Sequence, residues 1–151
     1  MVTHYVFGFG TAVALSPTFP AEVRVYLAIA LSLLVNLAID ELGHVTRKGF
    51  ISRSPLTHSI FTAPLWGGAI GYVVWRGSSE LGLAAGGLEW LFILLGAAVA
   101  WSHLLLDSMT ERGVFLFTQR IALAHFGSRN VLLNGLFIVL GIVLALTLPF
   151  G

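Results

Sequence analysis

The sequence predicts an all-α protein, a polytopic membrane bundle of four or five transmembrane helices, and two observations support this prediction. Hydrophobic residues make up 57% of the 151-residue chain and charged residues only 10%, whereas soluble domains carry about 25% charged residues. The apolar residues also gather into separate segments close to the length that crosses a bilayer. This length leaves no room for a second domain, so we expect a single integral membrane domain over residues 1–151.

Five apolar segments form the predicted bundle. A transmembrane helix needs about 20 mainly apolar residues to cross about 30 Å of hydrocarbon. The first segment, residues 4–16, is short and contains glycine, so it is either a short span or a re-entrant piece. The other four meet the length requirement and cover residues 22–39, 56–75, 88–106 and 131–149. Residues 112–127 are too polar to span and predict a short interfacial segment.

Turn and cap residues separate these segments. Residues 16–20, Ser-Pro-Thr-Phe-Pro, predict a turn between the first two segments. Ser54 followed by Pro55 is typical of a helix N-cap with proline at the first helical position. Residues 77–79, Gly-Ser-Ser, predict a short loop after the third segment. The segments therefore alternate in direction across the membrane.

The distribution of basic residues predicts the orientation. With the first segment counted as a crossing, one side of the membrane holds six lysine and arginine residues: Arg47, Lys48, Arg53, Arg112, Arg120 and Arg129. The other side holds only Arg24 and Arg76. Because cytoplasmic loops carry the excess of positive charge, we expect an integral protein of the cell membrane with its N-terminus inside.

The same alternation brings the ionisable residues of the segment ends to the cytoplasmic face. These candidate metal ligands are His4, Asp40, His44, His58, His103 and Asp107. The chain contains no cysteine, so a metal would be held by nitrogen and oxygen ligands. His103 and Asp107 stand four residues apart and share a helix face, and ionisable groups at the edge of an apolar run are usually functional.

The helix ends add an electrostatic argument. Asp40 and Asp107 end their predicted helices, where the dipole favours a bound cation. His58 is expected in the first turn of its helix, where the dipole favours an anion. This combination suits a metal that binds an anionic substrate such as a phosphoester. Taken alone, Asp40 is explained equally well by a side chain that extends to the lipid headgroups and binds no metal.

Several motifs resemble a known family. Thr3-His4, Ile39-Asp40, the run from Arg53 to Thr57-His58-Ser59, and the run His103-x3-Asp107-x2-Thr110-x2-Gly113 resemble the YdjM-type (DUF457/DUF1286-like) membrane proteins. That family is identified as metal-dependent hydrolases distantly similar to zinc-dependent phospholipase C and P1-type nucleases. The resemblance covers roughly residues 3–118.

The resemblance implies roles for individual residues. In the related enzymes the zinc ligands follow the order His, Asp, His, His-x3-Asp, which here corresponds to His4, Asp40, His58, His103 and Asp107. It implies one or two divalent ions, zinc first and manganese as an alternative, because the further ligands of a three-zinc site are missing. The role of His44 is less certain. The implied catalytic residues are Asp40, His58 and Arg53. Asp40 would bridge two metal ions or act as a general base, and Arg53 would hold an anionic group. Thr57 and Thr110 would orient ligands.

The sequence therefore predicts a membrane-embedded metal-dependent hydrolase that acts on phosphoesters at the cytoplasmic face. The expected partners are membrane lipid and a small-molecule or lipid phosphoester; nucleic acid is not expected, and the oligomeric state stays open. Two alternatives remain. A metal or proton transporter would need polar residues through its depth, and only Ser32, Asn36 and Asn134 are evident away from the cytoplasmic side. A membrane scaffold would hold a closed structural metal.

Overall fold

The computed structural model describes residues 2–47, 50–84 and 86–146, and these residues are mainly helical. The helices are Val2–Ala14 (α1), Ala21–Gly43 (α2), Pro55–His58 (α3), Thr62–Glu80 (α4), Glu89–Ser108 (α5) and Val131–Leu146 (α6). Two antiparallel hairpins complete the fold. They comprise His44–Arg47 (β1) with Phe50–Arg53 (β2), and Val114–Leu116 (β3) with Gln119–Ile121 (β4).

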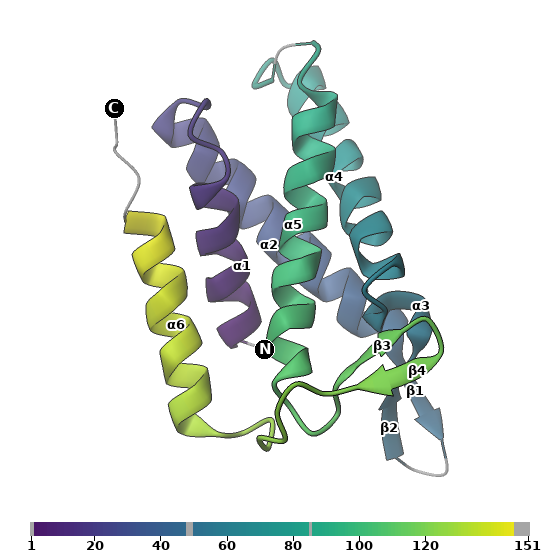
Figure 1. The fold of residues 1–151 in the computed structure, drawn as a ribbon. Coiled ribbons are helices and arrows are strands. Elements are labelled where there is room, and N and C mark those ends of the chain that lie inside the picture. The colour runs from purple at the N-terminus through teal and green to yellow at the C-terminus, as the bar shows by residue number, and fades with distance from the viewer. Residues whose placement is uncertain (1, 48–49, 85, 147–151) are drawn as a thin grey trace.

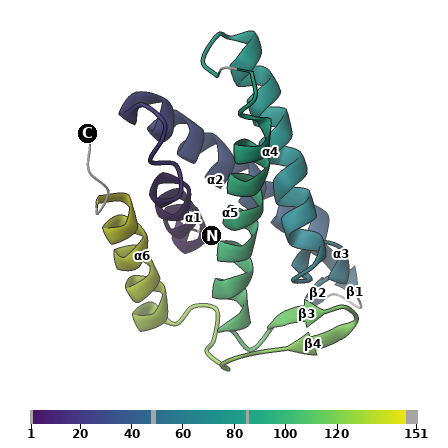
Figure 2. The same cartoon turned by 45° about the horizontal axis from the view of Figure 1, so that its top comes forward.

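The helices form a bundle in which α5 contacts α1, α2 and α4, while α6 packs along α1 (Figure 1). Both hairpins lie at the end of the bundle where α2 and α5 finish and where α1 begins (Figures 1 and 2). Chain direction explains this arrangement, because successive long helices run antiparallel. The arrangement carries the N-terminal residues of α1 and the C-terminal residues of α2 and α5 to one end.

Small residues allow the closest helix contact, between α4 and α5. A Cβ atom added to Gly67 or Gly71 would collide with backbone carbonyl groups of α5. A Cβ atom added to Gly96 of α5 would collide with the carbonyl group of Gly67. The two backbones therefore touch, as small residues permit in membrane helix pairs. Around this contact the core is closed by fully buried Leu31, Val35, Ile39, Phe92 and Val99.

Each of the five predicted segments contains a helix, but three local predictions were wrong. Residues 77–79, predicted as a loop, belong to α4, which continues to Glu80. Residues 56–75 are not one helix, because α3 ends at His58 and α4 starts at Thr62. The chain turns there to pair with the second hairpin, and the N–H of Ile60 donates to the carbonyl of Phe115 at 3.0 Å. The interfacial segment at 112–127 contains strands β3 and β4, so the fold is not purely α-helical.

Among the described residues, two helices are long and apolar enough to cross a membrane, α2 and α5. At about 1.5 Å per residue, these helices of 23 and 20 residues reach about 35 and 30 Å. The apolar helix α6 has 16 residues and is shorter. The mainly helical fold is thus confirmed, whereas the prediction of four or five spans is not supported, because only two of the described helices qualify as candidate spans.

Candidate metal centre

Histidine and aspartate side chains from four helices meet at the hairpin end of the bundle. His4 lies on the first turns of α1 and Asp40 in the last turn of α2. His58 ends α3, and His103 and Asp107 lie one turn apart at the end of α5. Each position follows from the antiparallel course of the helices. His4 and His103 are 99 positions apart along the chain, yet their ring centroids are only 4.3 Å apart.

Four ligand atoms surround a common centre. The Nε2 atom of His103 lies 3.2 Å from Oδ2 of Asp107 and 3.6 Å from Oδ1 of Asp40. The Nε2 atom of His58 lies 3.5 Å and 3.9 Å from the same two oxygen atoms. Ligands about 2.0–2.1 Å from a tetrahedral zinc ion are about 3.3–3.4 Å from one another. The observed separations are close to this value.

The hydrogen bonds of Thr57 define the tautomer of His58. The Thr57 hydroxyl donates to the carbonyl oxygen of Ile39 at 2.9 Å. Its single proton is then used, so it accepts from Nδ1 of His58 at 3.0 Å. With the proton on Nδ1, the Nε2 atom of His58 has a free lone pair that faces the two carboxylates.

Asn36 plays the equivalent role for His103. Its Nδ2 donates to the carbonyl oxygen of Ser32 at 2.6 Å, so its Oδ1 is the acceptor. This oxygen accepts from Nδ1 of His103 at 2.7 Å. In the neutral tautomer with this Nδ1 proton, the Nε2 atom of His103 has a free lone pair, as in His58. A histidine that ligates a metal is usually oriented in this way, through a hydrogen bond from its other ring nitrogen.

Without a cation, these atoms would repel one another. The Nε2 atoms of His58 and His103 and Oδ2 of Asp107 are buried and have no hydrogen-bond partner among the described residues. Buried polar atoms without partners are costly and rare, and here three converge with Asp40. Unprotonated nitrogen and carboxylate oxygen are the donors that a divalent transition metal prefers. The chemistry of this donor set therefore fits a metal ion.

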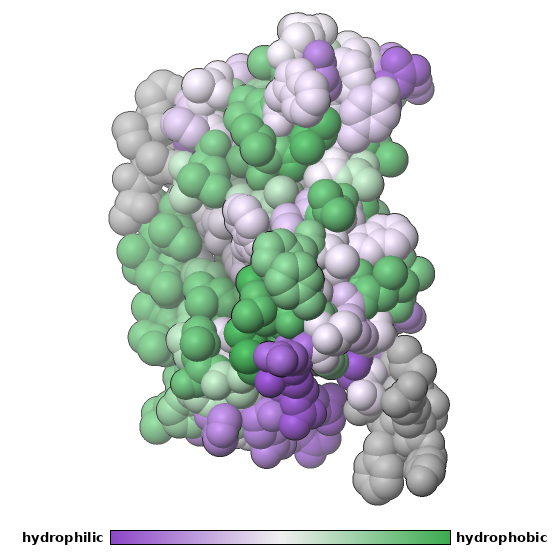
Figure 3. Space-filling view, turned by 45° about the vertical axis from the view of Figure 1, so that its right-hand side comes forward, coloured by the Kyte–Doolittle hydropathy of each residue, from purple (hydrophilic) through white to green (hydrophobic). Residues whose placement is uncertain are grey.

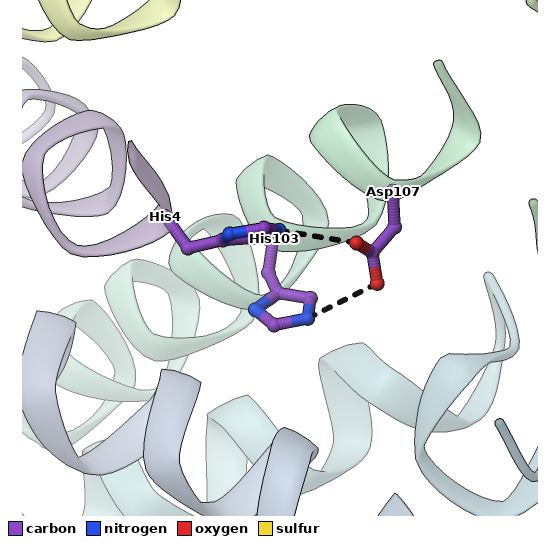
Figure 4. Close-up of side chains that lie close together, drawn as sticks. All are labelled: His4, His103 and Asp107. Carbon is purple, nitrogen blue, oxygen red and sulfur yellow. Dashed lines mark hydrogen bonds and ion pairs between the residues drawn. The ribbon is translucent and has the colours of Figure 1, made fainter. Parts of the chain in front are cut away.

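His4 and His44 flank the centre on opposite sides. Figure 4 shows His4 and His103 pointing from different helices toward the carboxylate of Asp107, and Nε2 of His4 lies 3.1 Å from its Oδ1. On the other side, Nε2 of His44 lies 3.8 Å from Oδ1 of Asp40. The residues form two adjacent groups that could each hold an ion, His4 with His103 and Asp107, and Asp40 with His44 and His58. The geometry thus accommodates one or two ions.

Arg53 binds protein groups of the centre. One Nη atom forms an ion pair with Oδ1 of Asp107. The other Nη donates to the carbonyl of Gly113 at 2.8 Å and to Oγ1 of Thr110 at 3.3 Å. Thr110 in turn donates to the carbonyl of Asp107 at 2.8 Å. The sequence-based role of Arg53, holding an anion, gives way here to positioning of the Asp107 carboxylate.

Burial changes the ionisation of two groups outside the long helices. Burial lowers the pKa of His58 to about 3, so its imidazole is neutral at physiological pH. Burial also lowers the pKa of Arg53, while the attraction of Asp107 opposes the shift. A neutral imidazole is the ligand form of histidine.

The centre opens into a pocket of about 170 Å³. The pocket is lined by His4, Asp40, His44, Arg53, Leu106, Asp107, Thr110, Arg112, Ser128, Leu133 and Asn134. The pocket therefore combines candidate metal ligands with two arginines, Arg53 of β2 and Arg112 before β3, and with residues at and before the start of α6.

All the predicted ligand positions meet at this end of the bundle, and one of them differs in its local placement. His58 ends a helix of four residues and does not start a long one, so the predicted dipole contribution at its position is wrong. Thr57 and Thr110 contact His58 and Asp107 as predicted for orienting groups. Asn36 was missed, because a single asparagine inside an apolar helix gives no spacing signal that connects it with His103.

Thr57 provides a test of this network. Thr57→Val removes the acceptor of the His58 Nδ1 proton, and we expect metal affinity to fall about 10- to 100-fold, as for loss of an orienting partner. Thr57→Ser retains the hydroxyl and should retain the affinity. Competition with a chelator measures both. Equal affinities of the valine and serine variants would contradict the assigned tautomer.

Comparison with known proteins gives one family. A family model described as a protein of unknown function, DUF1286, matches residues 1–106. The match includes His4, Asp40, His44, His58 and His103 and ends one residue before Asp107. No curated protein and no solved structure matches the chain. The predicted resemblance is thus confirmed for DUF1286 alone. The comparisons give no support for the YdjM-type hydrolases or for similarity to phospholipase C and P1-type nucleases.

Proposed function

Because the chain belongs to DUF1286, a family of unknown function, its activity has to be inferred from the site, and we propose a membrane-embedded metal-dependent hydrolase of phosphoesters. The observation that carries this proposal is the convergence of three buried, unpaired ligand atoms with Asp40, beside a pocket that Asp40 and Asp107 line. A structural metal needs a closed ligand shell, whereas a catalytic metal needs an accessible position. The pocket favours the catalytic role.

Exposed apolar side chains support a membrane location. Hydrophobic residues cover much of the middle of one face, and strongly hydrophilic residues gather at its lower end (Figure 3). Helix α6 is an example, because Val131 and Leu132 are 82% and 86% exposed in this single chain. We propose that α2, α4, α5 and α6 cross the bilayer. Helix α1, about 20 Å long at 13 residues, enters from the site end.

The charge distribution supports a cytoplasmic site. Arg53, Arg112, Arg120 and Arg129 lie in or beside the hairpin end, whereas Arg24 and Arg76 lie toward the opposite ends of α2 and α4. Lys48 belongs to this end by sequence and lies outside the described residues. Under the positive-inside rule, the hairpin end and the N-terminus are cytoplasmic.

The topology is testable because the chain has no cysteine. A cysteine introduced at exposed Ser128 should react with an impermeant maleimide only in inside-out vesicles. A cysteine at Gly77, where an added Cβ meets no atom within 4 Å, should react only in intact cells. Reaction of both positions from the same side would contradict the proposed arrangement.

The ligand set indicates the chemistry. A single ion would be held by Asp40, His58, His103 and Asp107. Two ions would instead be held by the two groups described above, His4 with His103 and Asp107, and Asp40 with His44 and His58. A divalent ion bound there would acidify a water molecule and polarise a phosphoryl oxygen. Asp40 lines the pocket and is placed to accept a proton from an attacking water, while Arg53 keeps the Asp107 carboxylate turned toward the histidines. Zinc is the proposed ion, with manganese as the alternative.

The function is tested with purified protein in detergent and in lipid vesicles. Hydrolysis of phosphodiester, phosphomonoester and lipid phosphoester substrates is measured with zinc or manganese added after chelation. The alcohol released is followed for the diesters, and the phosphate released is followed for the monoesters. We expect at least one substrate to be hydrolysed, and hydrolysis to disappear on chelation and return with metal. If the metal-loaded protein hydrolyses none of them, the hydrolase proposal is wrong.

A further inference from the structure

A second, smaller cavity adjoins the metal pocket. It has a volume of about 100 Å³ and is lined by Ser52, Arg53, Arg112, Phe115 and Arg120. Arg53 and Arg112 line both this cavity and the metal pocket. Arg120 lines only the outer cavity. A molecule bound at the metal could therefore extend past Arg112 toward Arg120.

The outer cavity carries positive charge that the protein does not neutralise. Within the described ranges, Arg112 and Arg120 form no ion pair, whereas Arg53 is paired with Asp107. Their charges lie close enough to Arg53 to lower its pKa. Gathering like charges without a counter-charge costs free energy, and a bound anion would remove this cost.

The second hairpin and the turn before it fix the backbone positions of Arg120 and Arg112, whose side chains are exposed. Arg120 is directly opposite Phe115 in the β3–β4 register. Phe115 accepts a hydrogen bond from Ile60 at 3.0 Å, which fastens the hairpin beside α3. Arg112 lies between Thr110 and Gly113, and both of these residues accept hydrogen bonds from Arg53. The arginines are therefore attached to the same framework that positions Asp107.

We propose that Arg112 and Arg120 form a subsite for a second phosphate group, so that the substrate is a diphosphate ester with one phosphate at the metal and the next at these arginines. This inference rests on the proposed function, because it assumes a phosphate at the metal. Guanidinium groups bind phosphate oxygens through paired, charge-assisted hydrogen bonds. An arginine that served only lipid headgroups would have no reason to line the pocket of Asp40 and Asp107, as Arg112 does.

Binding of hydrolysis-resistant analogues tests the subsite separately from turnover. Decyl phosphonate and its methylene-bridged diphosphonate are titrated by calorimetry into zinc-loaded protein in neutral detergent, at a buffered free zinc concentration. We expect the double variant Arg112→Gln/Arg120→Gln to bind the diphosphonate about 10- to 100-fold more weakly, as for loss of charge-assisted hydrogen bonds. Binding of the monophosphonate should change by less than about 3-fold. Exposed Arg129, which lines neither cavity, provides the control Arg129→Gln.

Other outcomes would overturn the subsite. Equal weakening of both analogues would show a general effect of charge, and unchanged binding of the diphosphonate would show that the arginines do not contact it. An effect confined to phosphatidylglycerol vesicles and absent from neutral detergent would assign the arginines to lipid headgroups. A protein that binds the diphosphonate through these arginines but hydrolyses no phosphoester would retain the subsite and refute the hydrolase.

Discussion

Replacing Asp107 with asparagine is expected to abolish metal binding and hydrolysis while the bundle stays folded. Asparagine preserves the shape of the side chain and an oxygen acceptor for Arg53. It removes the negative charge of the carboxylate, whose Oδ2 atom faces His58 and His103. The loss should exceed the about 10- to 100-fold effect of removing an orienting group. Metal analysis and phosphate release are measured on the same purified sample.

The matched control is Glu111→Gln. It makes the same carboxylate-to-amide change four residues further on, at an exposed position that lines no part of the metal pocket. We expect wild-type metal content in this variant. An Asp107→Asn protein that binds metal as well as the Glu111→Gln protein would show that Asp107 is not a ligand.

The second large effect concerns the α4–α5 contact. Gly96→Ala should destabilise the protein by about 3 kcal/mol or more, because overpacking costs about 1–3 kcal/mol even where flexible side chains can move. Here the added methyl group would meet the backbone of Gly67 and Gly71. Thermal unfolding in detergent, followed by circular dichroism, measures the change.

Gly135→Ala is the control for this substitution. Gly135 lies in α6, and an added Cβ meets no atom within 4 Å. Alanine is a better helix former than glycine by about 1 kcal/mol, so this variant should be as stable as the wild type or more stable. Equal destabilisation by the two substitutions would mean that the α4–α5 contact is not as close as described.

The sequence was sufficient for the helices and for the residues of the site because both depend on simple patterns. Apolar runs identified the five segments, and the alternation of direction placed His4, Asp40, His58 and His103 at one end. Their distances depend on packing between α1, α2 and α5, for example the contact that brings His4 to Asp107. No one-dimensional pattern records such a contact.

The hairpins and the role of Arg53 could not be predicted, because they too depend on contacts between distant parts of the chain. Residues 44–53 and 112–127 mix polar and apolar residues without a clear period, so tertiary contacts decide their structure. Ile60 bonds to Phe115 across 55 positions of the chain, and this bond breaks the expected helix. A basic side chain such as Arg53 is typical of an anion-binding residue, but both of its Nη atoms are bound to the neighbouring Asp107, Thr110 and Gly113.

The central claim is a metal held by histidine and carboxylate ligands at the hairpin end. X-ray absorption spectroscopy at the zinc edge of the zinc-loaded protein tests it most directly. We predict nitrogen and oxygen ligands at about 2.0–2.1 Å, with the outer-shell scattering of at least two imidazole rings, and loss of part of that imidazole scattering in His103→Ala. A coordination shell of oxygen atoms alone, or a spectrum that His103→Ala leaves unchanged, would contradict the account.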